Sequence, residues 1–194
     1  MTPDQALNAL MDGNRRFVDG TQQHNDHAAA RARGADGQSP FAGIIRCADS
    51  RVAPELVFDQ SLGELFVCAV AGNLPTTEVM ASLEYTVAML KTPLVVVMGH
   101  SSCGAVDATL AHEDDVSALP GHLPELASQI LPAVQDARDA EDRLACAIES
   151  NVRRGIQRLL EASDIIADAV RNDTCRVVGG VYDLATGRFT LLDD

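Results

Sequence analysis

The sequence is poor in basic residues and has no long apolar run. It contains 15 Lys and Arg against 28 Asp and Glu, so the formal net charge of the 194 residues is -13. Such a chain repels polyanions, which argues against nucleic acids and anionic membrane surfaces as partners. No apolar run approaches the roughly 20 residues that cross a bilayer, and the first residues carry no signal-peptide pattern. We therefore expect a cytoplasmic protein that binds neither nucleic acid nor membranes.

The sequence also lacks Cys-x-x-Cys pairs, internal repeats and low-complexity tracts. The missing Cys-x-x-Cys argues against a thiol-disulfide redox protein. We do not expect a disulfide framework in a cytoplasmic chain of this size, so each of the five cysteines is core filler, reactive thiol or metal ligand. The length suits one domain with a substantial core. We predict a single domain over 1–194, in which 1–40 form an N-terminal helix and arm and 41–194 the core.

Short apolar runs alternate with helical patterns, which predicts the α/β class. Four runs, beginning at Phe41, Leu65, Leu94 and Cys175, are typical of buried parallel strands. Helical periodicity predicts helices over 3–20, 76–91, 123–137 and 141–161, and a short one from Asp164. Residues 21–40 have no sustained apolar period and are expected to cross the surface or a partner subunit. The last residues predict two strands around an Ala-Thr-Gly turn. The expected fold is a mostly parallel central sheet flanked by helices, with an antiparallel C-terminal edge and an extended N-terminal helical arm.

Two groups of reactive side chains follow two of the predicted strands. Cys47-Ala48-Asp49-Ser50-Arg51 comes where the first strand ends, and His100-Ser101-Ser102-Cys103-Gly104 follows the strand from Leu94. In an open parallel sheet, binding sites form at the carboxyl ends of the strands. Cys103 would open the next helix, whose free amides favour a thiolate. We therefore expect both groups at one edge of one sheet.

Two thiolates and one imidazole form a ligand set that suits Zn²⁺. We predict that Cys47, His100 and Cys103 hold one zinc ion per subunit. Three protein ligands leave the fourth tetrahedral position open, which indicates a catalytic metal that makes hydroxide available under mild conditions. Asp49 is placed to accept a hydrogen bond from the metal-bound water, and Arg51 can hold Asp49 off the metal by a bidentate pair.

Taken one at a time, these residues have plainer interpretations. A buried cysteine is most often a small hydrophobe, and we predict that role for three cysteines: Cys68, Cys146 and Cys175. Histidines in polar segments are commonly exposed, and we predict this for four histidines: His24, His27, His112 and His122. The metal site is favoured by the conjunction of the two groups and not by either one alone.

The segments CADSRV and GHSSCGA resemble the two zinc-binding signatures of the beta-class carbonic anhydrases. The resemblance continues through LMDGNRRFVDG, GQSPFAGIIRCADSRV, the AGN of 71–73, SLEYTV and the closing strands, so it covers nearly the whole chain. It implies reversible hydration of carbon dioxide to bicarbonate and a proton by zinc-bound hydroxide. It also implies that Cys47, His100 and Cys103 are the zinc ligands and that Asp49 and Arg51 orient the hydroxide.

The same resemblance implies a set of substrate contacts. Phe66, Ala71 and Tyr85 match positions of the family's pocket wall. Gln38 matches an amide that binds substrate in one subgroup of the family, and the backbone amide of Gly104 is a second donor. The family further implies a homodimer or a dimer of dimers, in which the N-terminal helix wraps a neighbouring subunit and the active sites lie at the dimer interface.

A second subgroup of the family holds bicarbonate with a Trp and an Arg and can move its aspartate onto the zinc. Ile44 and Ala69 stand at those two positions here, so we predict no bicarbonate switch. Many relatives carry Arg where this chain has Ala69, and the change bears on a subunit contact or on the electrostatics of the pocket. It touches none of the zinc ligands.

Two other functions fit the same residues. One is hydrolysis of a molecule similar to CO₂, such as carbonyl sulfide or carbon disulfide, which the same fold and metal site can support. The other is a catalytically idle zinc-binding assembly protein. The pair of Asp49 and Arg51 argues against the second, because a structural zinc usually closes its fourth position with another ligand and needs no such pair.

Overall fold

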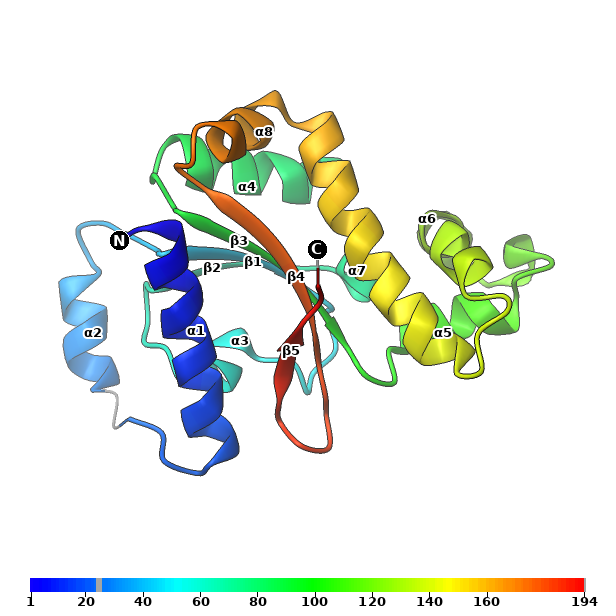
Figure 1. The fold of residues 1–194 in the computed structure, drawn as a ribbon, viewed down its shortest axis with the longest axis horizontal. Coiled ribbons are helices and arrows are strands. Elements are labelled where there is room, and N and C mark those ends of the chain that lie inside the picture. Colours follow the sequence, from blue (N-terminus) through cyan, green and yellow to red (C-terminus); the bar gives the residue numbers. More distant parts are fainter. Residues whose placement is uncertain (24–25, 194) are drawn as a thin grey trace.

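The computed structural model describes residues 1–23 and 26–193 (Figure 1). Five strands form one sheet in the order β2-β1-β3-β4-β5. The parallel strands are β1 (Ala42–Arg46), β2 (Leu65–Ala69), β3 (Leu94–His100) and β4 (Arg176–Tyr182), and β5 (Phe189–Leu191) runs antiparallel to β4. The predicted fold class, with its antiparallel C-terminal edge, is therefore confirmed. His24, which we predicted to be exposed, lies outside the described residues.

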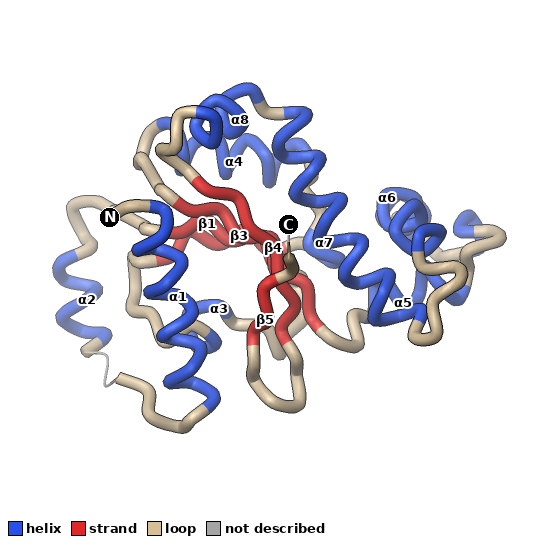
Figure 2. Tube along the Cα trace, in the orientation of Figure 1, coloured by secondary structure: helices blue, strands red, loops and turns tan. Residues whose placement is uncertain are grey.

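Helices cover both faces of the sheet (Figure 2). On one face lie α1 (Pro3–Val18) and α3 (Pro54–Val57), and on the other α4 (Thr77–Ala88), α7 (Arg143–Ala162) and α8 (Asp164–Arg171). β3 shows why both faces must be covered: all seven of its residues are buried, and successive side chains alternate between the two cores. Because both faces of the sheet are covered by apolar cores, its reactive side chains lie at the ends of the strands.

A third apolar cluster covers the carboxyl edge of the sheet. It is formed by α5 (Gly104–Ala111), α6 (Leu123–Asp136) and the first half of α7, together with Val70 and Leu74, which flank the short 3-10 helix η1 (Ala71–Asn73). A second 3-10 helix, η2 (Val116–Ala118), lies between α5 and α6. Cys47 and Cys103 belong to this cluster, so the two predicted sulfur ligands lie in an apolar environment at the predicted edge.

The first helix begins with a capping box, in which the Thr2 hydroxyl accepts from the Gln5 amide and the Gln5 side chain accepts from the Thr2 amide. Asn14 fixes this helix to the rest of the chain. Its amide donates to the carbonyls of Val57 (3.0 Å) and Gly187 (2.9 Å), and its Oδ1 accepts from the Phe189 amide (2.8 Å). These bonds join α1 to residues distant in sequence. That 1–194 form one domain, with 1–40 as its arm, stays a prediction.

Residues 27–33 form a helix that the sequence did not predict, α2 (His27–Arg33). Alanine and arginine are strong helix formers, and the Asp26 side chain caps the helix by accepting from the Ala29 amide at 3.0 Å. Only Ala30 is buried in it. α2 therefore has no apolar stripe, and a search of the sequence for apolar residues at helical spacing does not find this helix.

The remaining predictions for single residues are mostly confirmed. Cys68 and Cys175 are buried, and His27 and His122 are exposed. Cys146 is only half-buried. The prediction that His112 is exposed is wrong. This residue is half-buried because its ring lies 2.9 Å from the Ala108 carbonyl, one helical turn earlier.

Among residues 1–23 and 26–193, no helix combines the length and the apolar character needed to span a bilayer. The cytoplasmic location stays a prediction of the sequence.

Candidate metal centre

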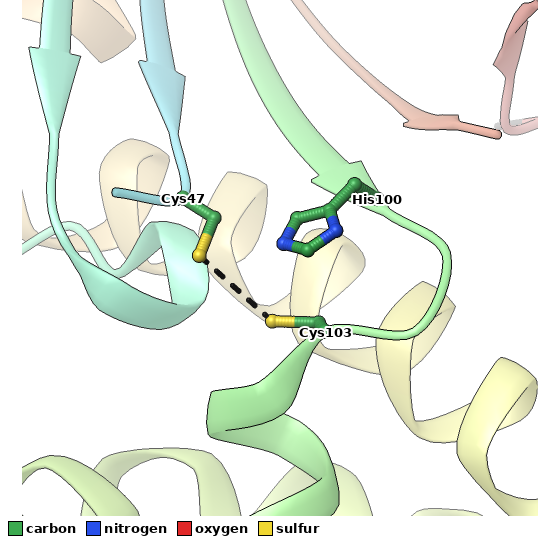
Figure 3. A group of neighbouring side chains, drawn as sticks. All are labelled: Cys47, His100 and Cys103. Atoms are coloured by element: carbon green, nitrogen blue, oxygen red, sulfur yellow. Dashed lines mark hydrogen bonds between the residues drawn. The ribbon is translucent and has the colours of Figure 1, made fainter. Parts of the chain in front are cut away.

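Cys47, His100 and Cys103 come together at the carboxyl edge of the sheet (Figure 3). Cys47 directly follows β1, His100 is the last residue of β3, and Cys103 is the N-cap of α5. One ligand atom from each lies within 4.8 Å of the other two, and all three residues are buried. The predicted juxtaposition follows from the parallel pairing of β1 with β3, which places both strand ends at one edge.

The turn from His100 to Cys103 is anchored to the end of β4. The Ser101 amide donates to the Tyr182 carbonyl at 2.9 Å, and the Ser101 hydroxyl accepts from the Leu184 amide at 3.0 Å. Ser102 has a φ of 54°, a left-handed conformation that reverses the chain within one residue. Sequence reasoning missed Ser101, whose contact depends on the fold of the last hairpin.

The His100 ring presents one nitrogen to a metal. Nδ1 lies 2.9 Å from the Ser101 carbonyl, so Nδ1 carries the proton and donates, and Nε2 is left as the free lone pair. Nε2 is buried and has no hydrogen-bond partner among the described residues. Because buried polar atoms normally have a partner, this nitrogen indicates that a cation belongs beside it.

The spacing of the two sulfurs also fits zinc. Cys103 Sγ lies 4.0 Å from Cys47 Sγ, and two sulfurs at about 2.3 Å from a tetrahedral zinc would be about 3.8 Å apart. The hydrogen bond from the Cys103 thiol lowers the pKa of Cys47 to about 4, against the effect of burial, and the same pairing raises the pKa of Cys103. The site therefore already favours a thiolate, which is the form that binds a metal.

Asp49 and Arg51 form the predicted pair at the mouth of this centre. Arg51 donates from Nε to Asp49 Oδ1 (2.9 Å) and from Nη2 to Oδ2 (2.7 Å), and its backbone amide also donates to Oδ1 (2.9 Å). These bonds hold the pKa of Asp49 well below its usual range. Oδ2 lies 3.9 Å from His100 Nε2. A charged carboxylate thus borders the metal position.

Arg46 hydrogen-bonds to the backbone of the loop that carries Cys47 and Asp49, and sequence reasoning missed this residue. Its Nη1 donates to the carbonyls of Cys47 (2.7 Å) and Asp49 (3.3 Å). The charge at the end of β1 therefore fixes the backbone that carries both a ligand and the carboxylate. A basic residue that ends an otherwise apolar strand is the signal that could have pointed to it.

The predicted substrate residues fall into two sets. Ala71 and Gly104 lie next to the metal centre and border an apolar pocket of about 300 Å³ between η1, α5 and α6. Gln38 is exposed and precedes β1, at the amino end of the strand that carries Cys47 on its carboxyl end. Phe66 and Tyr85 lie together, with ring centroids 6.3 Å apart.

Phe66 and Tyr85 are also distant from the metal ligands within one chain. Phe66 pairs with Gly43, and the four residue steps from Gly43 to Cys47 span ~13 Å of strand. Tyr85 lies on α4 with 48% of its surface exposed. A single chain therefore places Ala71 and Gly104 at the centre and keeps Gln38, Phe66 and Tyr85 away from it.

Comparison with known proteins identifies the family. A family model described as carbonic anhydrase matches residues 42–189. Carbonic anhydrase 2 of Mycobacterium tuberculosis is 39% identical over 193 residues, which cover 98% of this chain and 93% of that protein. The carbonic anhydrase of Mycolicibacterium smegmatis is 39% identical over 191 residues, with 97% and 93% covered. A solved Coccomyxa beta-carbonic anhydrase in complex with acetazolamide shares 31% identity at a TM-score of 0.75, with 96% of this chain and 86% of that chain covered. This chain therefore belongs to the beta-class carbonic anhydrases.

Proposed function

We propose that the protein catalyses the reversible hydration of CO₂ to bicarbonate and a proton, with one zinc ion per subunit held by Cys47, His100 and Cys103. The observation that carries the proposal is the buried Nε2 of His100, which faces two cysteine sulfurs and has no hydrogen-bond partner within residues 1–23 and 26–193. The bound ion would supply Lewis-acid chemistry, which makes water nucleophilic under mild conditions. The chain itself supplies orientation, a hydrogen-bond acceptor and an apolar slot.

Asp49 is the acceptor in this proposal. Its carboxylate stays charged because Arg51 donates to both oxygens, and the same bonds keep it off the metal position. The remaining lone pairs can accept one hydrogen bond from the attacking water. Asp49 and Arg51 are therefore catalytic residues that fix the direction of the attack.

Ala71 and Gly104 form the slot for CO₂. The pocket beside them is lined almost wholly by apolar side chains, which suits a small molecule without charge. Gly104 is the first residue of α5, where backbone amides have no partner within the helix. Its amide is thus available to donate to a substrate oxygen.

We further propose that Gln38, Phe66 and Tyr85 act in the active site of a second copy, in a homodimer or a dimer of dimers. β2 is an edge strand. Four exposed apolar side chains lie on the segments that flank it: Leu56, Leu62, Tyr85 and Met89. A second copy against this edge would cover them. It would also explain why one chain keeps three substrate residues away from its own metal centre.

The proposal includes no bicarbonate switch. Ile44 is fully buried in the sheet, and Ala69 is an exposed alanine at the end of β2. Neither side chain can donate a hydrogen bond to an anion. Asp49 is therefore expected to keep its pair with Arg51 in the presence of bicarbonate.

Substrate preference tests the proposal against its rivals. The zinc-loaded protein should hydrate CO₂ faster than it hydrolyses carbonyl sulfide or carbon disulfide at equal concentration. Acetazolamide, present in the solved Coccomyxa relative, should inhibit the reaction. A preference for either sulfur compound would replace the proposed substrate, and a zinc-loaded protein inert toward all three would indicate an assembly protein.

A further inference from the structure

α7 presents one polar side chain to the core beside the metal centre. Asn151 is 5% exposed, and its neighbours on the buried face of the helix are apolar or glycine: Ala147, Ile148, Val152, Gly155 and Leu159. Burial of an amide is unfavourable unless it forms hydrogen bonds. Asn151 must therefore have a specific partner.

That partner is Gly72, in the 3-10 helix η1 before α4. Asn151 Nδ2 donates to the Gly72 carbonyl at 2.8 Å, and the Gly72 amide donates to Cys47 Sγ at 3.4 Å. One residue, Gly72, thus joins α7 to a sulfur of the metal centre. Among the described residues, Asn151 is the only side chain that donates a hydrogen bond to the backbone of Gly72.

The conformation of Gly72 makes its orientation dependent on such an anchor. Its φ is 70°, in the left-handed region, and a β-carbon there would lie 2.7 Å from Ile130 Cδ1. Glycine is required, and glycine leaves the peptide free to rotate. Nearby backbone bonds fix Val70, whose amide donates to Arg46 and whose carbonyl accepts from Ala48. The Asn73 amide also donates to the Val70 carbonyl at 3.0 Å and closes the turn that contains Gly72, and Asn151 adds a side-chain bond that fixes the Gly72 carbonyl within this turn.

An N–H group directed at a metal-bound sulfur affects both its position and its charge. A hydrogen bond withdraws electron density from a thiolate, and residues that support metal ligands in this way typically change metal affinity 10–100-fold when replaced. Asn151 lies on a different helix from every predicted ligand, so its effect must pass through Gly72.

We propose that Asn151 is a positioning residue of the metal centre, which holds Gly72 so that the Gly72 amide bonds to Cys47 Sγ. The inference rests on the proposed zinc site and adds a residue to it. Asn151 touches neither the metal position nor the substrate pocket, and it acts only by fixing the sulfur.

Two substitutions of similar size test this role. Asn151→Leu removes the donor and keeps the volume, and Asn151→Asp places an acceptor against the Gly72 carbonyl. We expect both to bind zinc about 10–100-fold more weakly in competition with a chelator. In the cobalt-substituted proteins, the thiolate-to-cobalt absorption band should shift relative to wild type, because the sulfur has lost its hydrogen bond.

Leu159→Ala is the matched control. Leu159 is fully buried on the same face of α7, about two turns further along, so its truncation lowers stability without touching Gly72. It should lower Tm and leave zinc affinity and the cobalt spectrum unchanged. Should Asn151→Leu not fold, Asn151→Ser gives the same comparison, because its shorter side chain does not reach the Gly72 carbonyl.

Wild-type zinc affinity and an unchanged cobalt spectrum in folded Asn151 variants would overturn the inference. The proposed function fails separately: a wild-type protein that binds zinc tightly but does not hydrate CO₂ contradicts the enzyme, while the metal-binding comparison still tests Asn151.

Discussion

Asp49 Oδ2 lies 3.9 Å from His100 Nε2 while it accepts a hydrogen bond from Arg51 Nη2 at 2.7 Å. The carboxylate is thus near the metal position and at the same time held away from it. To bind the metal directly, Asp49 would have to break its hydrogen bonds to Arg51. It can accept a hydrogen bond from a water molecule without breaking them. This relationship separates the role of Asp49 from those of Cys47 and Cys103, and it leads to distinct predictions for Asp49 and Cys103.

Replacing Asp49 by alanine should leave zinc bound and remove most of the activity. The carboxylate is the acceptor that orients the attacking water, and loss of such a group typically lowers the rate by about 10²–10⁴-fold. Zinc content and stopped-flow CO₂ hydration measure the two effects separately. Asp168→Ala, an exposed change on α8, is the control and should behave as wild type. Loss of zinc from Asp49→Ala would show that the carboxylate is a ligand.

Replacing Arg51 by leucine should raise the pKa of Asp49. The arginine's hydrogen bonds favour the charged carboxylate and hold its pKa below the usual range, so without them the value should return toward about 3.9. In wild type, the stabilisation from this pair is present above the unfolded pKa and is lost as pH falls through the lower folded pKa. The ¹³C shift of the Asp49 carboxyl followed against pH gives both values. An unchanged titration in Arg51→Leu would exclude Arg51 as the cause.

Replacing Cys103 by alanine should abolish zinc retention, since it removes one of three ligands. Cys175→Ala is the control: Cys175 is buried as well but belongs to the core under α4, α7 and α8 and not to the cluster at the carboxyl edge, so the variant should retain one zinc per subunit. Atomic absorption after dialysis measures the difference. A Cys103→Ala protein that keeps both its zinc and full activity would contradict the ligand assignment.

Replacing Met89 by aspartate should dissociate the proposed dimer. Met89 is exposed beside Tyr85 near the β2 edge, and a buried charge at an interface is strongly unfavourable. Light scattering should show a fall in mass, with loss of activity because Gln38, Phe66 and Tyr85 no longer reach a second active site. Ile165→Asp, on the exposed side of α8, should leave the mass unchanged. A fully active monomer would remove the dimer from the mechanism.

The sequence predicted the metal centre better than the substrate site, for a physical reason. Cys47 directly follows one parallel strand and His100 ends its neighbour, and strand pairing alone brings such positions together. Gln38 and Tyr85 depend on how two copies meet, which no pattern within one chain specifies. The helix α2 was also missed, because it has no apolar stripe that a sequence pattern could reveal.

Asn151 and Gly72 form a contact across 79 positions of sequence. In the sequence, this contact is indicated only by one polar residue, Asn151, within the apolar stripe of a predicted helix. Such a residue predicts that a buried partner exists, but the fold alone decides which one.

The most direct test of the account is stopped-flow CO₂ hydration by the zinc-loaded protein, by the same protein after removal of the metal with a chelator, and by the stripped protein after zinc is restored. The account predicts rapid hydration that disappears with the metal and returns with it. A protein that carries a full complement of zinc and does not hydrate CO₂ would contradict it.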